Sequence, residues 1–344
     1  MHIEVRPADL QQDRDLLTDL LSRHLHQEAG GPRFDWLYEK NPHGRAHAWL
    51  AIADADKPAG VAAAFPRRLR TGDGVEVGCV FGDFCITPQY RSLGLALQLQ
   101  RACLDCIGSP SCSLGYDFPS NRMMAIYKRM QIPEFGRVVR WAKLLRLDRV
   151  ATRALGSARL GRRIAAPANR LLKWKDSLFP ESAQWSVREH AAECGEEFSA
   201  LASSVGARYG ICVDRSAAYL NWRYRGHPLR RYEMLTARRK GALAGYVVFS
   251  HTGEDASIAD LFGLDDTSLW TALVAEAVAV LRSRGVIALS VAMLVSDPRA
   301  GLFRKLSFRA RESCPVVVCG RSSDGRSFNG PRAPWLLMDG DRES

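Results

Sequence analysis

The sequence predicts an α/β chain in which one arrangement of strands and helices occurs twice. Short apolar runs with strand character alternate with segments whose apolar residues recur at helical spacing. The motif Trp-x-Tyr-x-x-x-Pro begins at Trp36 and again at Trp222, which indicates an internal repeat. A strand, a glycine-containing turn and an amphipathic helix follow one another between residues 77 and 101, and they organise the first half.

The first half is predicted to be a series of short elements. We expect a strand at 3–7, helices at 9–24 and 34–40, and strands at 48–53 and 59–65. After the stretch from 77 to 101 come a strand at 113–118, a helix that Asn121 can cap, and one or two strands at 135–145 that close the unit. The helix at 34–40 ends before Pro42, because the residue before a proline is disfavoured in a helix.

The turn between residues 91 and 96 suits the binding of an anion. Pro88 ends the preceding strand because it cannot donate to a sheet ladder. The first amides of the following helix have no partner inside the helix, and Gly94 allows close approach to the backbone. An ordinary connection between a strand and a helix is the alternative interpretation.

The residues of this turn resemble the acyl-CoA motif of the GNAT acyltransferase superfamily. The matching pattern is Ile86-x-Pro88-x-Tyr90-Arg91-x-x-Gly94-x-Ala96. The resemblance implies two sets of binding residues. One is the turn that holds the CoA diphosphate, Arg91, Ser92, Leu93, Gly94, Leu95 and Ala96; the other is the strand edge that pairs with the pantetheine arm, Phe84, Cys85 and Ile86.

The same resemblance implies candidate catalytic residues. The run from Asn121 to Tyr127 is similar to the family's Asn-x-x-x-Ala-x-Tyr pattern, which implies Asn121 near pantetheine and Tyr127 as the acid for the leaving thiolate. A core aromatic is the alternative for Tyr127, because Phe303 is its counterpart in the repeat. Asp83 is a candidate base, but its counterpart Asp260 favours a structural role for this pair; water relays are a further route for the proton.

The second half repeats the order of the first without its CoA turn. Where the diphosphate would lie, this half carries Asp265 and Asp266, whose charges would repel it. The resemblance therefore implies two tandem GNAT-like domains, each a mixed, mostly antiparallel sheet flanked by helices. We expect a CoA-binding and catalytic domain at 1–145, a basic linker at 146–184 and a degenerate domain at 185–344.

The net charge of +11 is concentrated between residues 140 and 175. Such a segment favours an acidic partner, either a membrane surface, an anionic acceptor or nucleic acid. Gly156, Gly161 and Pro167 are expected to interrupt any long helix there, leaving one or two basic amphipathic turns. A solvated connector packed across both domains is an equal alternative.

The remaining composition bears on the compartment. The first residues lack the apolar core of a signal peptide, and no run of about twenty apolar residues could span a membrane. Nine cysteines, an odd number scattered among apolar neighbours, favour a reducing compartment. We therefore expect a cytoplasmic protein, with peripheral membrane contact through 146–175 as an option. The pair Cys103 and Cys106 is interpreted as core thiols, and no metal is expected.

These observations favour an acyl-CoA-dependent N-acyltransferase, with acetyl-CoA as the expected co-substrate. The acceptor is expected to be a small-molecule amine bound between the repeats, such as an amino sugar, a cell-envelope precursor or a small amine. One alternative is an aminoacyl-tRNA-dependent transferase resembling the Fem family. The basic linker suits RNA, but the intact CoA turn argues against this, and no specific nucleic acid is expected. The other alternative is a module that binds acyl-CoA without turnover.

Overall fold

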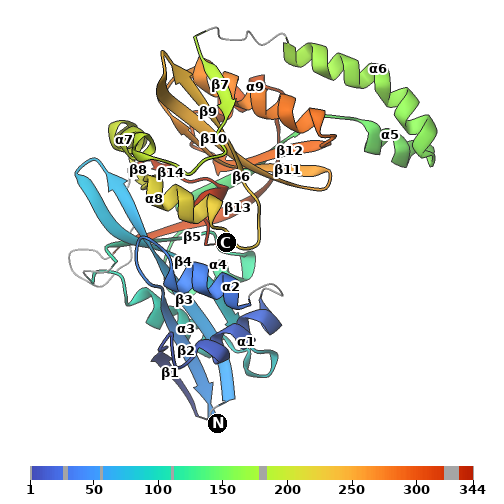
Figure 1. Ribbon diagram of the computed structural model, residues 1–344. Helices are drawn as coiled ribbons and strands as arrows, with labels where there is room; N and C mark the ends of the chain where they lie inside the picture. The colour runs from blue at the N-terminus through green and yellow to red at the C-terminus, as the bar shows by residue number, and fades with distance from the viewer. Residues whose placement is uncertain are drawn as a thin grey trace.

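The computed structural model describes residues 2–25, 30–54, 57–109, 112–177, 184–320 and 333–343. Within these ranges, 14 strands join into one sheet that runs through both halves of the chain. The path through it is β1-β2-β3-β4-β5-β13-β6-β12-β11-β10-β9-β7, and β8 and β14 pair beside this path. Figure 1 shows the two halves end to end, with the C-terminus near their junction.

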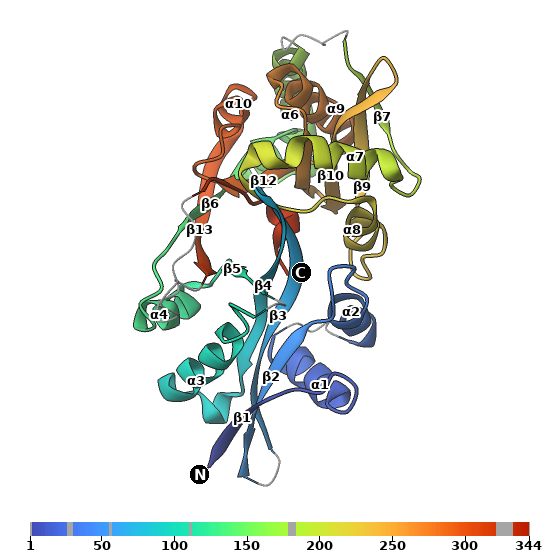
Figure 2. The same cartoon turned by 90° about the vertical axis from the view of Figure 1, so that its left-hand side faces the viewer.

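The first half contains the elements expected from its periodicity. They are β1 (Ile3–Pro7), α1 (Arg14–His24), α2 (Gly31–Phe34), η1 (Asp35–Glu39), β2 (His47–Ala53), β3 (Lys57–Thr71), β4 (Gly74–Ile86), η3 (Pro88–Tyr90), α3 (Leu93–Leu104), β5 (Leu114–Asp117), α4 (Asn121–Arg129) and β6 (Gly136–Leu144). Figure 2 shows α3 on one face of this sheet and α1 and α2 on the other.

The second half follows the same order after two connecting helices, α5 (Asp148–Leu155) and α6 (Ala158–Ser177). Its elements are β7 (Ser186–Glu189), α7 (Glu196–Val205), η4 (Gly206–Tyr209), β8 (Ile211–Val213), α8 (Ala217–Leu220), η5 (Asn221–Arg225), β9 (Glu233–Arg239), β10 (Ala242–Thr252), β11 (Asp255–Gly263), α9 (Thr267–Ser283), β12 (Ala288–Leu294), α10 (Ala300–Lys305), β13 (Arg309–Gly320), β14 (Trp335–Leu336) and η6 (Asp339–Asp341).

The repeat predicted from the sequence is present in the sheet. Strands β3 and β4 pair antiparallel, and β4 then pairs parallel with β5 after the crossover helix α3. Strands β10 and β11 pair antiparallel in the same way, and β11 pairs parallel with β12 after α9. The predicted fold class, two tandem units with mixed and mostly antiparallel sheets, is thereby confirmed.

The two halves exchange their last strands. We expected the strand at 135–145 to close the first unit, and this is wrong. Strand β6 instead lies between β12 and β13, pairing antiparallel with both. Strand β13, the last long strand of the second half, pairs with β5 of the first half. Apolar periodicity identifies a strand but does not identify its partner, because pairing depends on residues far away in the sequence.

The connecting segment is more regular than its composition suggested. Gly156 ends α5 with φ of 65°, as expected, but helix α6 continues for 20 residues with Gly161 and Pro167 inside it, so the interruption expected at those two residues is wrong. A proline inside a helix removes one backbone hydrogen bond, so α6 forms in spite of that loss. Asp176 fixes α6 by pairing with Lys143 of β6, the strand that lies in the sheet of the second half, and with Arg282 of α9. None of the helices in the described ranges is both long and apolar enough to span a bilayer.

Candidate active site

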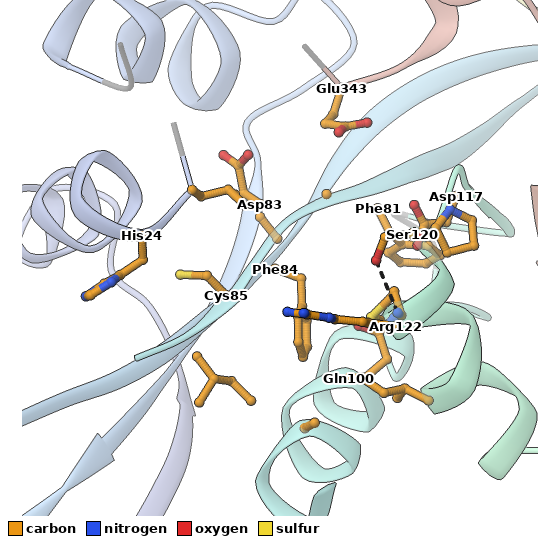
Figure 3. Close-up of a pocket in the computed structure, with 18 of the residues that line it drawn as sticks. His24, Phe81, Asp83, Phe84, Cys85, Gln100, Asp117, Ser120, Arg122 and Glu343 are labelled. Atoms are coloured by element: carbon orange, nitrogen blue, oxygen red, sulfur yellow. Dashed lines mark hydrogen bonds between the residues drawn. The ribbon is translucent and has the colours of Figure 1, made fainter. Parts of the chain in front are cut away.

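A cavity of about 700 Å³ opens where β4 and β5 separate. The two strands are paired only from Gly78 to Val80 on β4, whereas β4 continues to Ile86. Beyond Val80, no strand in the described ranges pairs with the edge of β4 that faces β5, so this edge can bind another extended chain. Figure 3 shows residues of β4, α3, β5 and α4 around this space, together with His24 and Glu343.

The first turn of α3 forms one wall of the cavity. Ser92 caps the helix: its hydroxyl accepts from the Leu95 amide at 3.2 Å, and its carbonyl accepts from the Ala96 amide at 3.1 Å. The amides of Leu93 and Gly94 lie in the same turn, where no helical carbonyl can reach them. A Cβ placed on Gly94 would meet no atom within 4 Å, so the space beside this backbone is open.

Four of the six residues predicted for this turn line the cavity. They are Arg91, Ser92, Leu93 and Ala96. Leu95 is buried under the turn, so it supports the helix from the core. The guanidinium of Arg91 donates from Nε to the carbonyl of Ile86 at 3.3 Å, which ties the turn to the end of β4.

The predicted strand edge also lines the cavity, with Phe84, Cys85 and Ile86 all at its surface. The register between β3 and β4 shifts by one residue between Cys85 and Gly82, which makes a β-bulge at residues 83–84. A bulge leaves one residue outside the ladder and turns its backbone groups away from the neighbouring strand. The structure thus places a bulge at the centre of the cavity wall.

Asp83 lies in this bulge with φ of 47°, and its carboxylate forms hydrogen bonds inside the protein. Its two carboxylate oxygens each accept from the Arg33 guanidinium at 2.8 Å, and the Tyr38 hydroxyl donates to one of them at 2.8 Å. Its counterpart Asp260 is held in a similar way by Arg215. Two buried Asp–Arg pairs at equivalent positions favour the structural role, because only one half carries the turn at residues 91–96 that resembles a CoA motif.

Tyr127 is fully buried beneath the cavity and does not line it. Its hydroxyl donates to Asp117 Oδ2 at 2.7 Å and accepts from the side-chain amide of Gln100 at 3.1 Å. Burial, reinforced by the charge of Asp117, raises the pKa of Tyr127 well above its ordinary value. Asp117 and Gln100 do line the cavity, so they connect this hydroxyl to it.

Asn121 is exposed at the start of α4 and is not among the lining residues. Ser120, and not Asn121, caps this helix: its hydroxyl accepts from the Met123 amide at 3.2 Å. Ser120 and Arg122 line the cavity on either side of Asn121.

Two carboxylates that the sequence analysis missed also face the cavity. Asp117 ends β5 and is 9% exposed, and Glu343 reaches it from the chain's last residues. Burial, and next the charge of Glu343, raises the pKa of Asp117 to about 7. The tail is held in place by Tyr116, whose hydroxyl donates to the Asp341 carbonyl at 2.8 Å. No local motif marks this pair, because it forms only when the two halves pack together.

The equivalent place in the second half is filled by the protein itself. Asp266 caps α9, and its carboxylate accepts from the amides of Ser268 and Leu269, which closes the first turn to another anion. The buried guanidinium of Arg299 donates to the carbonyl of Leu261 on β11 at 2.6 Å. In the described part of the second half, side chains of the protein thus occupy helix amides and a strand carbonyl at the place that is open in the first half.

Known proteins match this chain in structure but not in sequence. No family model matches the sequence, and none of the curated proteins matches it either. Solved structures do match at low identity. A probable N-acyltransferase of Enterococcus faecalis has 12% identity and a TM-score of 0.65, with 93% of this chain and 72% of that chain covered. A GCN5-related N-acetyltransferase of Anabaena variabilis has 15% identity and a TM-score of 0.66, with coverage of 92% and 72%.

A third solved structure shares the tandem arrangement. It is a tandem GNAT protein from the clavulanic acid biosynthesis pathway, with 15% identity, a TM-score of 0.56, and coverage of 93% of this chain and 98% of that chain. Its match extends over both repeats. Together with the cavity between β4 and β5, these similarities show that the chain has the fold of the GNAT superfamily in tandem form.

Proposed function

We propose that this protein is an acyl-CoA-dependent N-acyltransferase whose one active site lies in the first half. The observation that supports it most directly is the cavity between β4 and β5. This cavity joins an open helix N-terminus, a free strand edge and a pair of carboxylates. The solved structures with the same fold are described as acetyltransferases or acyltransferases, which agrees with this proposal.

The residues of the first half fit a CoA thioester. The amides of Leu93 and Gly94 would hold the diphosphate, since helix N-termini favour anions, and Arg91 and Arg122 add positive charge at the cavity surface. The free edge of β4 at residues 84–86 would pair with the amides of the pantetheine arm. A backbone amide at the bulge would donate to the thioester oxygen as negative charge develops there.

Asp117 has the properties of a general base for an ammonium acceptor. A base works best when its pKa is near the operating pH, and the pKa of Asp117 is raised to about 7. Glu343 adds a second carboxylate on the same cavity, whereas the charge of Asp83 is balanced by Arg33. This acidic end of the cavity would attract a cationic amine, and Asp117 would take the proton that the amine loses.

Tyr127 remains the predicted acid for the leaving thiolate, and its contacts suggest how its proton is controlled. Its hydroxyl is bonded to Asp117, so the acid and the base share one hydrogen-bonded unit. We also propose that the phenol orients Asp117 toward the cavity. Acetyl-CoA is the co-substrate we propose, and an amino sugar, a cell-envelope precursor or a small amine are the acceptors.

The test is a binding and turnover screen with the full chain. We expect acetyl-CoA to raise the melting temperature, to bind with a stoichiometry of one, and to release free CoA when a suitable primary amine is present. Stabilisation by charged tRNA without stabilisation by acetyl-CoA would favour the Fem-like alternative. CoA binding with no thiol release across a broad panel of amines would favour a non-catalytic module. Binding of two CoA molecules per chain would contradict a single site.

A further inference from the structure

Three cysteines lie close together in the first half, near the C-terminal end of α3 and away from the turn at residues 91–96. Cys79 lies on β4, Cys106 just after the end of α3, and Cys112 just before β5. Their sulfur atoms all lie within 4.8 Å of one another. Cys79 and Cys112 are fully buried, whereas Cys106 is partly exposed, so the cluster is accessible from solvent through one member.

The backbone fixes this arrangement through a short turn. The Gly108 amide donates to the Cys112 carbonyl at 2.7 Å, and the Cys112 amide donates to the Ser109 carbonyl at 3.1 Å. The Ser109 hydroxyl donates to the Cys106 carbonyl at 2.6 Å. These bonds bring Cys106 and Cys112 back toward each other, and β4 supplies the third thiol from the sheet.

The spacing of the sulfur atoms is close to that of a metal site. A tetrahedral zinc ion with Zn–S bonds of about 2.3 Å separates its sulfur ligands by about 3.8 Å. Sulfurs already within 4.8 Å need to close by only about 1 Å to reach that separation. Three thiolates form a soft ligand set, which selects zinc or copper(I) over magnesium and calcium.

His47 is on β2 and, with Trp49, belongs to the face of the sheet that α3 covers. An imidazole is the donor type that completes Cys₃His zinc sites. The ring nitrogens of His47 lie outside the group of ligand atoms within 4.8 Å of one another, so the ring would have to turn toward the three sulfurs to bind the ion.

We propose that Cys79, Cys106 and Cys112 form a structural zinc site, with His47 as the candidate fourth ligand. Binding would replace the thiol protons with the metal and release them to the solvent. The ion would fasten the C-terminal end of α3 to β4 and to the start of β5. Because the N-terminal end of α3 carries the CoA turn, the site would hold that helix in register with the cavity.

The experiment uses Co²⁺ as a spectroscopic substitute for zinc, added to the reduced full-length protein. We expect one equivalent to produce a thiolate-to-cobalt charge-transfer band that Zn²⁺ then abolishes by displacement. Cys106→Ser should lose most of this band. Removing a hydrogen-bond partner of a metal ligand typically lowers metal affinity by about 10- to 100-fold. Because Cys106 is itself a proposed ligand, the Zn²⁺ affinity of this variant should fall by more than that. His47→Ala should weaken binding less than Cys106→Ser does.

Cys194→Ser is the matched control, since Cys194 is also a buried thiol but lies in the second half. It should leave the cobalt spectrum unchanged. A measurement on the unmodified chain guards against variants that do not fold: bound Zn²⁺ should protect Cys79, Cys106 and Cys112 from alkylation, as read by mass spectrometry. A cobalt spectrum without a thiolate band, equal loss in Cys194→Ser, or a disulfide among the three in freshly purified protein would each overturn the proposal.

Discussion

Trp36 and Trp222 each donate an indole N–H to the backbone carbonyl of the other, both at 2.8 Å. Their rings stack with centroids 4.7 Å apart, although the residues are 186 positions apart in the sequence. Trp36 lies in η1, the short π-helical segment after α2, and Trp222 lies in η5, the equivalent segment after α8. The repeated motif therefore makes a two-fold contact between the halves. The role of both tryptophans is therefore structural at this junction.

Trp36→Phe should destabilise the protein by about 1–3 kcal/mol, because it leaves the buried carbonyl of Trp222 without its donor. Chemical denaturation of the variant measures this change. Trp141→Phe is the control, since the buried indole N–H of Trp141 has no hydrogen-bond partner in the described part of the chain. Equal loss of stability in the two variants would show that ring volume, and not the reciprocal bond, is responsible.

Gly94→Glu should abolish tight binding of acetyl-CoA while the protein stays folded. The new side chain enters open space, so its cost falls on the bound diphosphate and not on the core. Calorimetry of the variant against wild type measures the affinity. Gly94→Ala is the matched control, because it adds a Cβ to the same open space without charge and should retain most of the binding. Unchanged affinity in Gly94→Glu would remove the CoA site from this turn.

Glu343→Gln should move the rising limb of the pH–rate profile to lower pH. The charge of Glu343 helps to raise the pKa of Asp117, so its removal lowers that pKa and deprotonates the base at lower pH. In the wild type the limb should be centred at about 7. Glu312→Gln removes an exposed carboxylate of the second half and should leave the profile in place. A profile that does not move in Glu343→Gln would exclude this coupling.

Tyr127→Phe should lower turnover more than it lowers the affinity for acetyl-CoA. Loss of a positioned acid typically costs about 100- to 10,000-fold in rate. The variant also removes the hydroxyl donor of Asp117, whose hydrogen bond lowers the pKa of that carboxyl, so the rising limb of the pH–rate profile should move to higher pH. Steady-state kinetics and calorimetry separate the two quantities. Turnover equal to wild type would leave Tyr127 as a packing residue, like Phe303 in the repeat.

We also propose that α6 contacts anionic membrane surfaces weakly. Leu160, Leu171 and Trp174 are 54–60% exposed, and Arg159, Arg170 and Lys173 of the same helix are exposed too. Each basic residue near a charged membrane contributes about 1 kcal/mol. The double variant Arg170→Glu with Lys173→Glu should reduce flotation with anionic vesicles, whereas Arg230→Glu with Arg231→Glu should not. Equal flotation with neutral and anionic vesicles would exclude an electrostatic contact.

The extent to which the sequence predicts this site depends on how local each feature is. The turn from Arg91 to Ala96 could be read directly, because a helix N-terminus is built from consecutive residues. The loss of the equivalent turn in the second half was also predictable from Asp266, which now caps α9. These features need no knowledge of the rest of the fold.

Asp117 and Glu343 could not be predicted in the same way. Their proximity depends on the bond between Tyr116 and Asp341, which are 225 residues apart. The strands that pair with β6 could not be predicted from the sequence for a similar reason, because each half provides a strand that completes the sheet of the other. Hydrophobic patterning specifies which residues face a core but not which distant strand completes a sheet.

The exchange of β6 and β13 has a consequence for how the chain folds as it is synthesised. Gly115 on β5 meets Cys319 on β13 across 204 residues, so β5 keeps an open edge until β13 has also left the ribosome. Folding one domain at a time from the N-terminus, the common order for two-domain proteins, would leave that edge open to other chains. Native assembly therefore requires both halves to be present together, and contacts of such high sequence separation form slowly. A genetic separation of the halves would leave β12 without the neighbour that β6 provides and β5 without β13.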